Sequence, residues 1–468
     1  MFKKKIVSLV VFLMIGTIVL TSCVSQVEPE VIRETEIVYV EGTPVVQYVE
    51  VTPGPKEETE LGPDDVVTIT WWGTERGKDT AETREIHFRL ARAFEDSHPN
   101  TKVAVALFPS RAFATRVLTG IAAGQGPDIW YHYWSPDIAT QGFLEDLTPY
   151  LERDAIDPEE MYFPIGDIRG KYDGKYYALP RDATAYVFVY NKEVFDAAGV
   201  EYPQPGWTIE DFREKAIAIT DQENNVYGVS TIDDGWFQWH PFSFNLGVDF
   251  LSLDGTQVEG YMDTPEAINA MKFILDLEAV DQVAAPDGLA DQFGYDYLSG
   301  QIGMFGVTSW EYLAFIEQVD FDYGVISPPS WEEGEESISW TDSYMFYMNK
   351  DSIYKERVWE FMKFLTGPEA AQIIADSNVW TPAIPEIWVE SGWVDDPILG
   401  EVYAELQKPA RVLNYERNQF YWDCVGGVWG VIMTGYIDEG KTDLDVIVPP
   451  LVQEAQACLD RNMASLED

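Results

Sequence analysis

The chain has 468 residues and a formal net charge of −49 at pH 7, from 80 acidic and 31 basic side chains. This excess of acid argues against a nucleic-acid partner and against electrostatic docking on anionic lipid, because phosphate groups would be repelled. The apolar content of 46% excludes wholesale disorder, and the length is sufficient for two domains of ordinary size.

The first 22 residues have the features of a secretory signal. Basic residues from Lys3 to Lys5 precede an uncharged apolar run, Ile6 to Leu20, which is shorter than the roughly 20 apolar residues of a membrane span. Leu20-Thr21-Ser22-Cys23 resembles the lipobox of bacterial lipoproteins, in which the cysteine is acylated and becomes the mature N-terminus. We therefore expect residues 1–22 to be removed and a lipid on Cys23 to anchor an extracytoplasmic protein to the cell membrane. An uncleaved anchor helix is the alternative.

Residues 23–65 are predicted to form an acidic, flexible tether. They are rich in Glu, Pro, Val and Thr, and Thr-Pro turns occur at Thr43-Pro44 and Thr52-Pro53. The acidic excess favours a solvated, extended chain. The Val, Ile and Tyr content from Val31 to Val51 leaves a strand-like stalk as the alternative.

From Val66 onward the chain alternates short apolar runs with amphipathic helical stretches. This is the pattern of an α/β fold, in which helices cover a sheet. Ile86, Leu90 and Phe94 recur at a spacing of four and predict one buried helix face. The first strands are expected at Val66–Trp71, Val103–Phe108 and Ile129–Tyr133.

Later helices have recognisable boundaries. Thr208 with Asp211 predicts a capped helix start, and Pro265 suits the first turn of another. Gly367-Pro368 should end one helix just before the next begins.

Cysteine usage agrees with export. Cys424 and Cys458 are expected to form a disulfide, with two buried free thiols as the alternative. Neither has a CxxC partner, and the four histidines are scattered, so we expect no metal site and no cofactor.

The placement of the tryptophans suggests a ligand site. Many of the sixteen tryptophans lie in loops, where a ring can cover the C–H face of a sugar while nearby polar groups bind its hydroxyls. For each of them, core packing is the alternative. Arg181 could bind a ligand or simply pair with Asp182. The candidate ligand-binding residues from this placement are Trp72, Asp128, Trp134, Arg181, Trp236, Trp239, Trp310, Trp340 and Trp380; Asp342 and Tyr344 join them only through the family resemblance described below.

Several segments, taken in order, carry a family resemblance. The chain resembles the extracellular solute-binding proteins of ABC importers, the sugar-binding group that includes maltose-binding proteins. The matching segments are Ala123-Gly124-Gln125-Gly126-Pro127-Asp128-Ile129, Gly142-Phe143-Leu144-Glu145-Asp146-Leu147, Gly174-Lys175-Tyr176-Tyr177-Ala178-Leu179-Pro180, Tyr190-Asn191-Lys192-Glu193-Val194-Phe195, Trp207-Thr208, Ser299-Gly300-Gln301-Ile302-Gly303-Met304 and Trp359-Glu360-Phe361.

The resemblance implies a two-lobed periplasmic-binding-protein-like fold of type II. Each lobe would be a mostly parallel sheet flanked by helices, and hinge crossings would join the lobes. Lobe one would comprise residues 66–181 plus 304–349, and lobe two residues 185–302 plus 351–468. Crossings are expected near Arg181–Ala185, Gln301–Met304 and Asn349–Ser352.

The sequence departs from the family pattern at two places. Gln301 stands where the family usually has lysine, and Asp342-Ser343 replaces a common Gly-Gly. The second departure would add a carboxylate near the cleft.

We therefore expect a non-enzymatic, monomeric binder that captures a mono- or oligosaccharide and delivers it to an ABC permease in the membrane. The alternative is a secreted glycoside hydrolase, which would need two carboxylates roughly 5–10 Å apart. The chain has 80 acidic residues, and the sequence alone does not indicate which two would form that pair.

Overall fold

The computed structural model describes the backbone of residues 32–40 and 43–51, together with residues 65–75, 80–109, 113–133, 142–232, 240–245, 247–286, 289, 296–309, 312–313, 318–410, 418 and 420–464. The chain divides into two compact units, Met1–Gly54 and Pro55–Asp468. In the described part of the chain, none of the helices has both the length and the apolar composition that crossing a bilayer requires.

The N-terminal unit contains a β-hairpin. Strands β1 (Ile32–Val40) and β2 (Thr43–Val51) pair antiparallel over their full length, with Ile32 opposite Val51. The flexible tether over residues 23–65 stays a prediction, and the two strands lie in the stretch for which a strand-like stalk was the alternative. The Val, Ile and Tyr residues favour extended structure, and only Glu41-Gly42 separates the strands, which suits a tight hairpin connection.

The first sheet of the larger unit has the order β4-β3-β5-β14-β8. Strand β3 is parallel to β4 and β5, whereas β14 runs antiparallel to β5 and β8. The three strands predicted from the sequence are confirmed. Their bounds are β3 Val67–Glu75, β4 Thr101–Pro109 and β5 Ile129–Tyr133, and the other two strands are β8 Ala178–Pro180 and β14 Tyr344–Met348.

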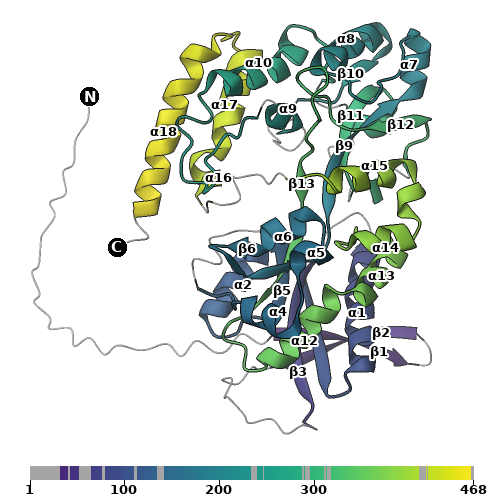
Figure 1. The fold of residues 1–468 in the computed structure, drawn as a ribbon, viewed down its shortest axis with the longest axis vertical. Helices are drawn as coiled ribbons and strands as arrows, with labels where there is room; N and C mark the ends of the chain where they lie inside the picture. Colours follow the sequence, from purple (N-terminus) through teal and green to yellow (C-terminus); the bar gives the residue numbers. More distant parts are fainter. Residues whose placement is uncertain are drawn as a thin grey trace, which may run out of the picture. The chain divides into compact units, whose positions relative to one another are not determined.

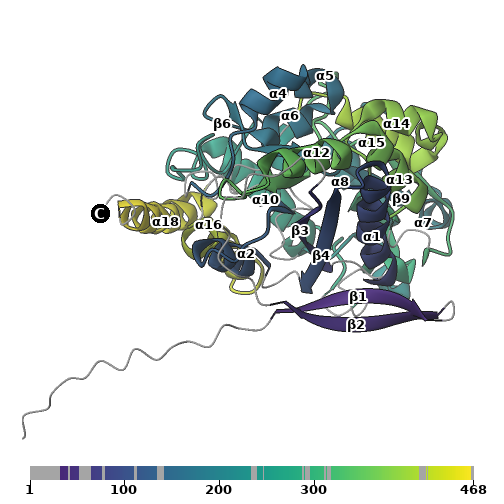
Figure 2. The same cartoon turned by 90° about the horizontal axis from the view of Figure 1, so that it is seen from below.

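Helices from two distant parts of the chain pack together beside this sheet (Figure 2). Helix α1 (Thr80–Ser97) contacts β3 and β4, and it also contacts α12 (Lys355–Leu365) and α13 (Pro368–Ser377). The rings of Trp71, Phe94 and Phe361 meet in the resulting core. On β3, Trp72 belongs to a separate cluster with α2 (Phe113–Ala122).

The second sheet has the order β10-β11-β9-β12 (Figure 1). Strand β9 (Thr184–Asn191) is antiparallel to β11 (Ile302–Thr308) and β12 (Tyr323–Ile326), and β10 (Tyr227–Val229) is parallel to β11. Along β9, Ala185, Val187 and Val189 enter one core cluster, whereas Tyr186 and Phe188 enter another. This alternation is the period of two that a strand buried on both faces requires.

The pairing of these strands differs from the predicted lobe boundaries. Residues 304–349 were expected in lobe one, but β11 and β12 are bonded to β9 in the second sheet. Residues 351–468 were expected in lobe two, but α12 and α13 pack in the first core cluster. The physical reason is that hydrogen-bonded partners, which sequence order does not reveal, decide the sheet to which each segment belongs.

Helix boundaries follow the predicted signals. Thr208 and Asp211 form a reciprocal capping box at α8 (Ile209–Ile219), and Thr264 caps α10 (Pro265–Ala279), which has proline in its first turn. Gly367 separates α12 from α13. The remaining elements used below or visible in Figure 1 are β6 Lys171–Tyr172, β7 Lys175–Tyr176, β13 Thr341–Asp342, α4 Thr148–Asp154, α5 Pro158–Met161, α6 Pro164–Gly170, α7 Lys192–Ala198, α9 His240–Asn245, α14 Pro385–Glu390, α15 Pro397–Leu406, α16 Tyr421–Cys424, α17 Gly426–Ile437 and α18 Leu444–Ala464.

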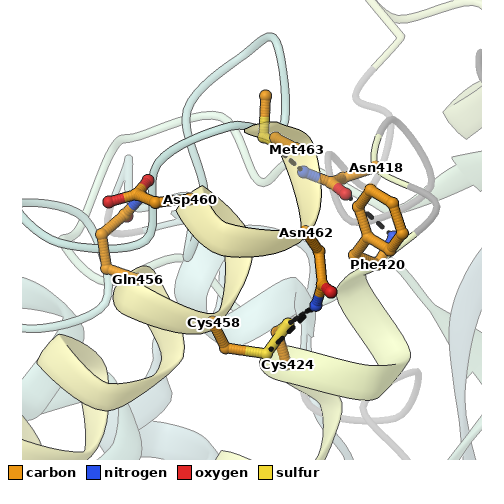
Figure 3. Close-up of a disulfide and its surroundings, with 8 residues drawn as sticks. All are labelled: Asn418, Phe420, Cys424, Gln456, Cys458, Asp460, Asn462 and Met463. Atoms are coloured by element: carbon orange, nitrogen blue, oxygen red, sulfur yellow. Dashed lines mark hydrogen bonds between the residues drawn. A yellow bond between two sulfur atoms is a disulfide. The ribbon is translucent and has the colours of Figure 1, made fainter. Parts of the chain in front are cut away.

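A disulfide joins α16 to α18 (Figure 3). Cys424 and Cys458 have Cα atoms 5.4 Å apart, which is an ordinary separation for such a bridge. The Nδ2 group of Asn462 lies 3.2 Å from Cys424 Sγ. The bridge therefore fixes the short helix α16 against the long C-terminal helix.

Candidate functional site

The two sheets of the larger unit are joined by two neighbouring segments. One runs from β8 to β9 through Arg181–Ala183, and the other runs from β13 to β14 through Ser343. Asp182 Oδ1 accepts a 2.8 Å hydrogen bond from the Tyr344 amide, and Ser343 Oγ donates to the Asp182 carbonyl at 2.6 Å. These contacts hold the two crossing segments side by side.

Only the first of the three expected crossings coincides with this arrangement. Residues Gln301–Met304 lie inside the second sheet, where Ile302 and Met304 pair with β10. Asn349–Ser352 follow β14 and lead into α12 on the first-sheet side, with Ser352 Oγ bonded to Asp128 Oδ1 at 2.7 Å. The second crossing, at Asp342–Tyr344, was predicted as site residues rather than as a crossing.

Arg181 lies in an aromatic cage at the first crossing. Its guanidinium carbon is 4.4 Å from the ring centre of Tyr131, 4.5 Å from Tyr344 and 4.2 Å from Trp380. Nε donates a 3.0 Å hydrogen bond to Asp182 Oδ2, and the terminal nitrogen Nη2 pairs with the same oxygen. The sequence left two roles open for Arg181, ligand binding and pairing with Asp182, and the structure shows the pair. The cation is 8% exposed and its charge is compensated within the protein.

Asp342 also has a partner within the chain. Its Oδ1 atom lies 2.7 Å from Nη2 of Arg169 on α6, whose side chain is completely buried. The Ser343 amide donates to the same oxygen at 2.6 Å. The carboxylate that departs from the pattern of the resembled family is therefore neutralised by a buried arginine. It stays 15% exposed.

Three of the predicted tryptophans that the structure describes are buried in packed clusters. Trp72 is 8% exposed and lies edge-on to Phe108, with ring centres 5.0 Å apart. Trp340 is 3% exposed and packs in the second-sheet core. Trp380 is 7% exposed and covers Arg181. These three tryptophans are therefore packed in the protein core, which was the alternative to a role in ligand binding.

Asp128 has a structural position. It is 1% exposed, and its Oδ2 atom accepts hydrogen bonds from both the amide and the hydroxyl of Thr70, each at 2.8 Å. The other oxygen accepts from Ser352. The side chain therefore links β3 to the segment after β14 instead of presenting a carboxylate to a ligand.

A buried histidine, His87, contacts Tyr131 of the cage. His87 Nδ1 lies 2.6 Å from the Thr83 carbonyl, and Nε2 lies 2.9 Å from the hydroxyl of Tyr131. Burial lowers the pKa of His87 to about 3, and the charge of Arg181 contributes in the same direction. The imidazole is therefore neutral, which avoids a second buried cation close to Arg181.

The most exposed of the predicted residues in the described part of the chain are Asp342 and Tyr344, which are partly exposed. Trp134, Trp236, Trp239, Trp310 and the lipidation candidate Cys23 lie outside the described residues.

Sequence reasoning missed Arg169 and did not select Tyr131 as a candidate, although both support the site. It also did not single out Trp422, whose indole on α16 is 55% exposed. The signal for Trp422 was the aromatic run Phe420-Tyr421-Trp422, because one short helix cannot bury three consecutive rings on one face.

We find no candidate metal site among the described residues. No group of three or more His, Cys, Asp or Glu side chains there is arranged to hold a metal ion. What the arrangement offers is aromatic surface, hydroxyls and internally paired charges, which suit binding by contact and hydrogen bonding.

Comparison with known proteins agrees with this architecture. Residues 80–372 match the family model of the bacterial extracellular solute-binding proteins. The maltotriose-binding protein of Pyrococcus abyssi is 25% identical over 373 residues, covering 78% of this chain and 77% of the relative.

Two solved structures have the same fold. The sugar-binding protein MalE of Xanthomonas citri superposes with a TM-score of 0.72 at 19% identity, covering 86% of this chain and 100% of its own. An ABC substrate-binding protein from Listeria monocytogenes in complex with cycloalternan gives 0.68 at 24% identity, with the same coverage. The predicted type II periplasmic-binding fold is thus confirmed, and these comparisons do not support the hydrolase alternative. The chain belongs to the family of bacterial extracellular solute-binding proteins, which bind a solute outside the cytoplasm and are not enzymes.

Proposed function

We propose that this chain binds an uncharged mono- or oligosaccharide where the two crossing segments join the sheets, and delivers it to the membrane subunits of an ABC importer. The observation that carries the proposal is the partly exposed pair Asp342 and Tyr344 at the crossings, within a fold shared with proteins whose names record maltotriose, cycloalternan or sugar binding. Aromatic rings provide apolar faces for sugar rings, and the neighbouring hydroxyls and carboxylates provide hydrogen bonds.

The charge distribution supports an uncharged ligand. Arg181 and Arg169, the cations at the two crossings, are each paired with an aspartate of the chain itself. A phosphate or carboxylate on the ligand would have to compete with Asp182 or Asp342 for these cations. It would also enter the field of a chain with a net charge of −49.

Ligand binding is testable by thermal shift and calorimetry on the purified protein. The panel would contain maltotriose and shorter neutral sugars, together with glucose 6-phosphate and glucuronate as charged counterparts of glucose. A true ligand at 100 times its Kd stabilises the folded state by about 2.7 kcal/mol. Stabilisation by the charged compounds alone would contradict the choice of an uncharged ligand, and release of reducing sugar from an oligosaccharide would contradict a binding role.

Substitutions then locate the site. Trp310→Ala and Tyr344→Ala each remove one candidate aromatic ring, and Tyr172→Ala removes an exposed ring on β6 that is not a candidate. We expect weaker binding from Tyr344→Ala, which removes the partly exposed ring at the crossings, and an unchanged Kd for Tyr172→Ala. Unchanged affinity in both Trp310→Ala and Tyr344→Ala would remove these two residues from the site.

The proposal includes a membrane anchor at Cys23 and a monomeric state. The supporting observation is the basic and apolar leader followed by Leu20-Thr21-Ser22-Cys23. In a bacterial host, the wild-type chain should fractionate with membranes and carry the added mass of a lipid, whereas Cys23→Ser should lose that mass. Recovery of Cys23→Ser with the lipid mass intact would contradict lipidation at this residue, and sedimentation of the lipid-free variant reports its oligomeric state.

A further inference from the structure

An unusual contact lies where α15 packs against the second sheet. Helix α15 contacts β9 and β12 (Figure 1), and its Tyr403 lies against Phe163 and Trp388 of the first core cluster. The segment that leaves β12 starts with Ser327 and later returns to β13. This helix therefore contacts the second sheet and belongs to the first core cluster, beside the strand that continues from the first crossing.

Two carboxyl groups of α15 share one hydroxyl. Ser327 Oγ is 2.7 Å from Glu401 Oε1 and 2.5 Å from Glu405 Oε1. A serine hydroxyl has a single proton and can donate only one of these two hydrogen bonds. A proton kept on one of the two carboxyl groups would make the second contact a hydrogen bond as well.

The surroundings favour retention of that proton. The Glu405 side chain is completely buried, and its Oε2 atom has no hydrogen-bond partner among the described residues. Burial raises the pKa of Glu405, and the charge of Glu401 adds to this, whereas Lys408 and Ser327 act in the opposite direction. Among the described residues, one cation contacts this pair of carboxyl groups.

That cation is Lys408, whose Nζ atom is 2.7 Å from Glu405 Oε1 and 3.1 Å from the Ser337 carbonyl. On β9, which contacts α15, the residues Ala185, Val187 and Val189 belong to the same core cluster as the apolar residues of α15. A cavity of about 210 Å³ beside the contact is lined in part by Glu335, Glu336, Glu401 and Lys408. Among the described residues, other titratable groups on elements packed against α15 are Tyr186 and Tyr190 on β9, Tyr323 on β12, Asp395 in the turn before α15, and Tyr312, which donates to Asp396.

We propose that Glu401, Ser327 and Glu405 hold one shared proton in the folded protein at neutral pH and so form a proton-dependent clasp between α15 and the segment leaving β12. Loss of the proton leaves two carboxylates and one hydroxyl proton at the contact, which weakens it. The clasp does not depend on the identity of the ligand.

The sign of the pH effect follows from proton binding. Between the pKa of a free glutamate, about 4.3, and the raised folded value, the folded state binds one proton more than the unfolded state. The clasp therefore contributes its full stability when the pH is below the pKa of a free glutamate. This contribution is lost as the pH rises through the raised pKa of the carboxyl group in the folded protein. The unfolding equilibrium constant should rise by up to about tenfold per pH unit within that window.

Urea unfolding between pH 5 and pH 8.5 tests the clasp on the full folded protein. Glu405→Gln replaces the carboxyl with an uncharged group of the same shape and should remove this pH dependence. Glu390→Gln, an exposed glutamate on α14, is the matched control and should retain the wild-type dependence. Wild-type and Glu405→Gln curves that stay parallel across the pH range would overturn the proposal.

Infrared spectroscopy of the wild-type protein provides a second readout that needs no variant to fold. At pH 7 the ordinary carboxyl groups are ionised, so a protonated carboxylic acid band reports the shared proton. We expect this band at pH 7, its disappearance at high pH, and its absence in Glu405→Gln or Glu401→Gln. Absence of the band from the wild-type protein at pH 7 would overturn the proposal.

Discussion

Arg181 shows how a single buried cation can organise a candidate site. Its guanidinium touches Tyr131, Tyr344 and Trp380 and is bonded to Asp182. Removal of one partner of a buried ion pair leaves an uncompensated charge, which typically costs about 3–5 kcal/mol. Arg181→Ala should therefore lower the free energy of unfolding by an amount in this range, measured by urea denaturation.

Arg116 is the matched control for this prediction. It also lies over an aromatic ring, with its guanidinium carbon 4.4 Å from the centre of Phe108, but its side chain is exposed. Exposed cation–π contacts contribute roughly 0.5–1 kcal/mol, so Arg116→Ala should have a small effect. Equal losses in the two variants would mean that the buried pair with Asp182 contributes nothing beyond ring stacking.

At the scale of elements, the contact between β10 and α8 depends on a glycine. A Cβ atom added at Gly228 would lie 2.7 Å from Ala216 Cα, which belongs to the backbone of α8 and cannot rotate away. Overpacking of this kind typically costs about 1–3 kcal/mol. Gly228→Ala should therefore destabilise the second-sheet region, with an earlier midpoint in urea unfolding.

Gly430 provides the comparison, because an added Cβ on this residue of α17 meets no atom within 4 Å. Alanine is favoured over glycine inside a helix by about 0.8–1.0 kcal/mol, so Gly430→Ala should stabilise the protein slightly. Changes of the same sign in Gly228→Ala and Gly430→Ala would contradict the packing explanation.

Local signals predicted several elements well. The apolar runs gave the positions of β3, β4 and β5, and the Thr208–Asp211 pair marked the start of α8, because strand period and helix capping are properties of neighbouring residues. The sheet that contains β11 and β12 depends instead on pairing with β9, more than 100 residues away. No local pattern carries that information.

The candidate site was predicted less completely, for a related reason. Loop position identified Arg181 and Trp380 as residues of interest, the family resemblance added Tyr344, and the structure brings these three together. Loop position did not show that Trp72, Asp128 and Trp340 are buried, because burial depends on long-range packing by α2, Ser352 and the second core cluster. The pairing of Asp342 with Arg169 was hidden for the same reason.

At the scale of the whole molecule, the acidic excess shapes the stability. Lysine and arginine side chains are commonly paired with carboxylates, as in Lys363 with Asp154 and Arg213 with Asp281. With 80 acids and 31 basic residues, most carboxylates still have no basic partner available. Their mutual repulsion destabilises the compact state, whereas the exposed ion pairs contribute little each.

Salt should therefore stabilise this protein. The Debye length falls from about 30 Å at 0.01 M to about 10 Å at 0.1 M ionic strength, so added salt screens the long-range repulsion before it affects close or buried pairs such as Arg181–Asp182. We expect Tm to rise between 10 mM and 200 mM NaCl at pH 7.5, and to rise equally in KCl at the same ionic strength. A fall in Tm would show that the ion pairs contribute more to stability than the acidic excess removes, and a difference between the two salts would indicate specific ion binding instead of screening.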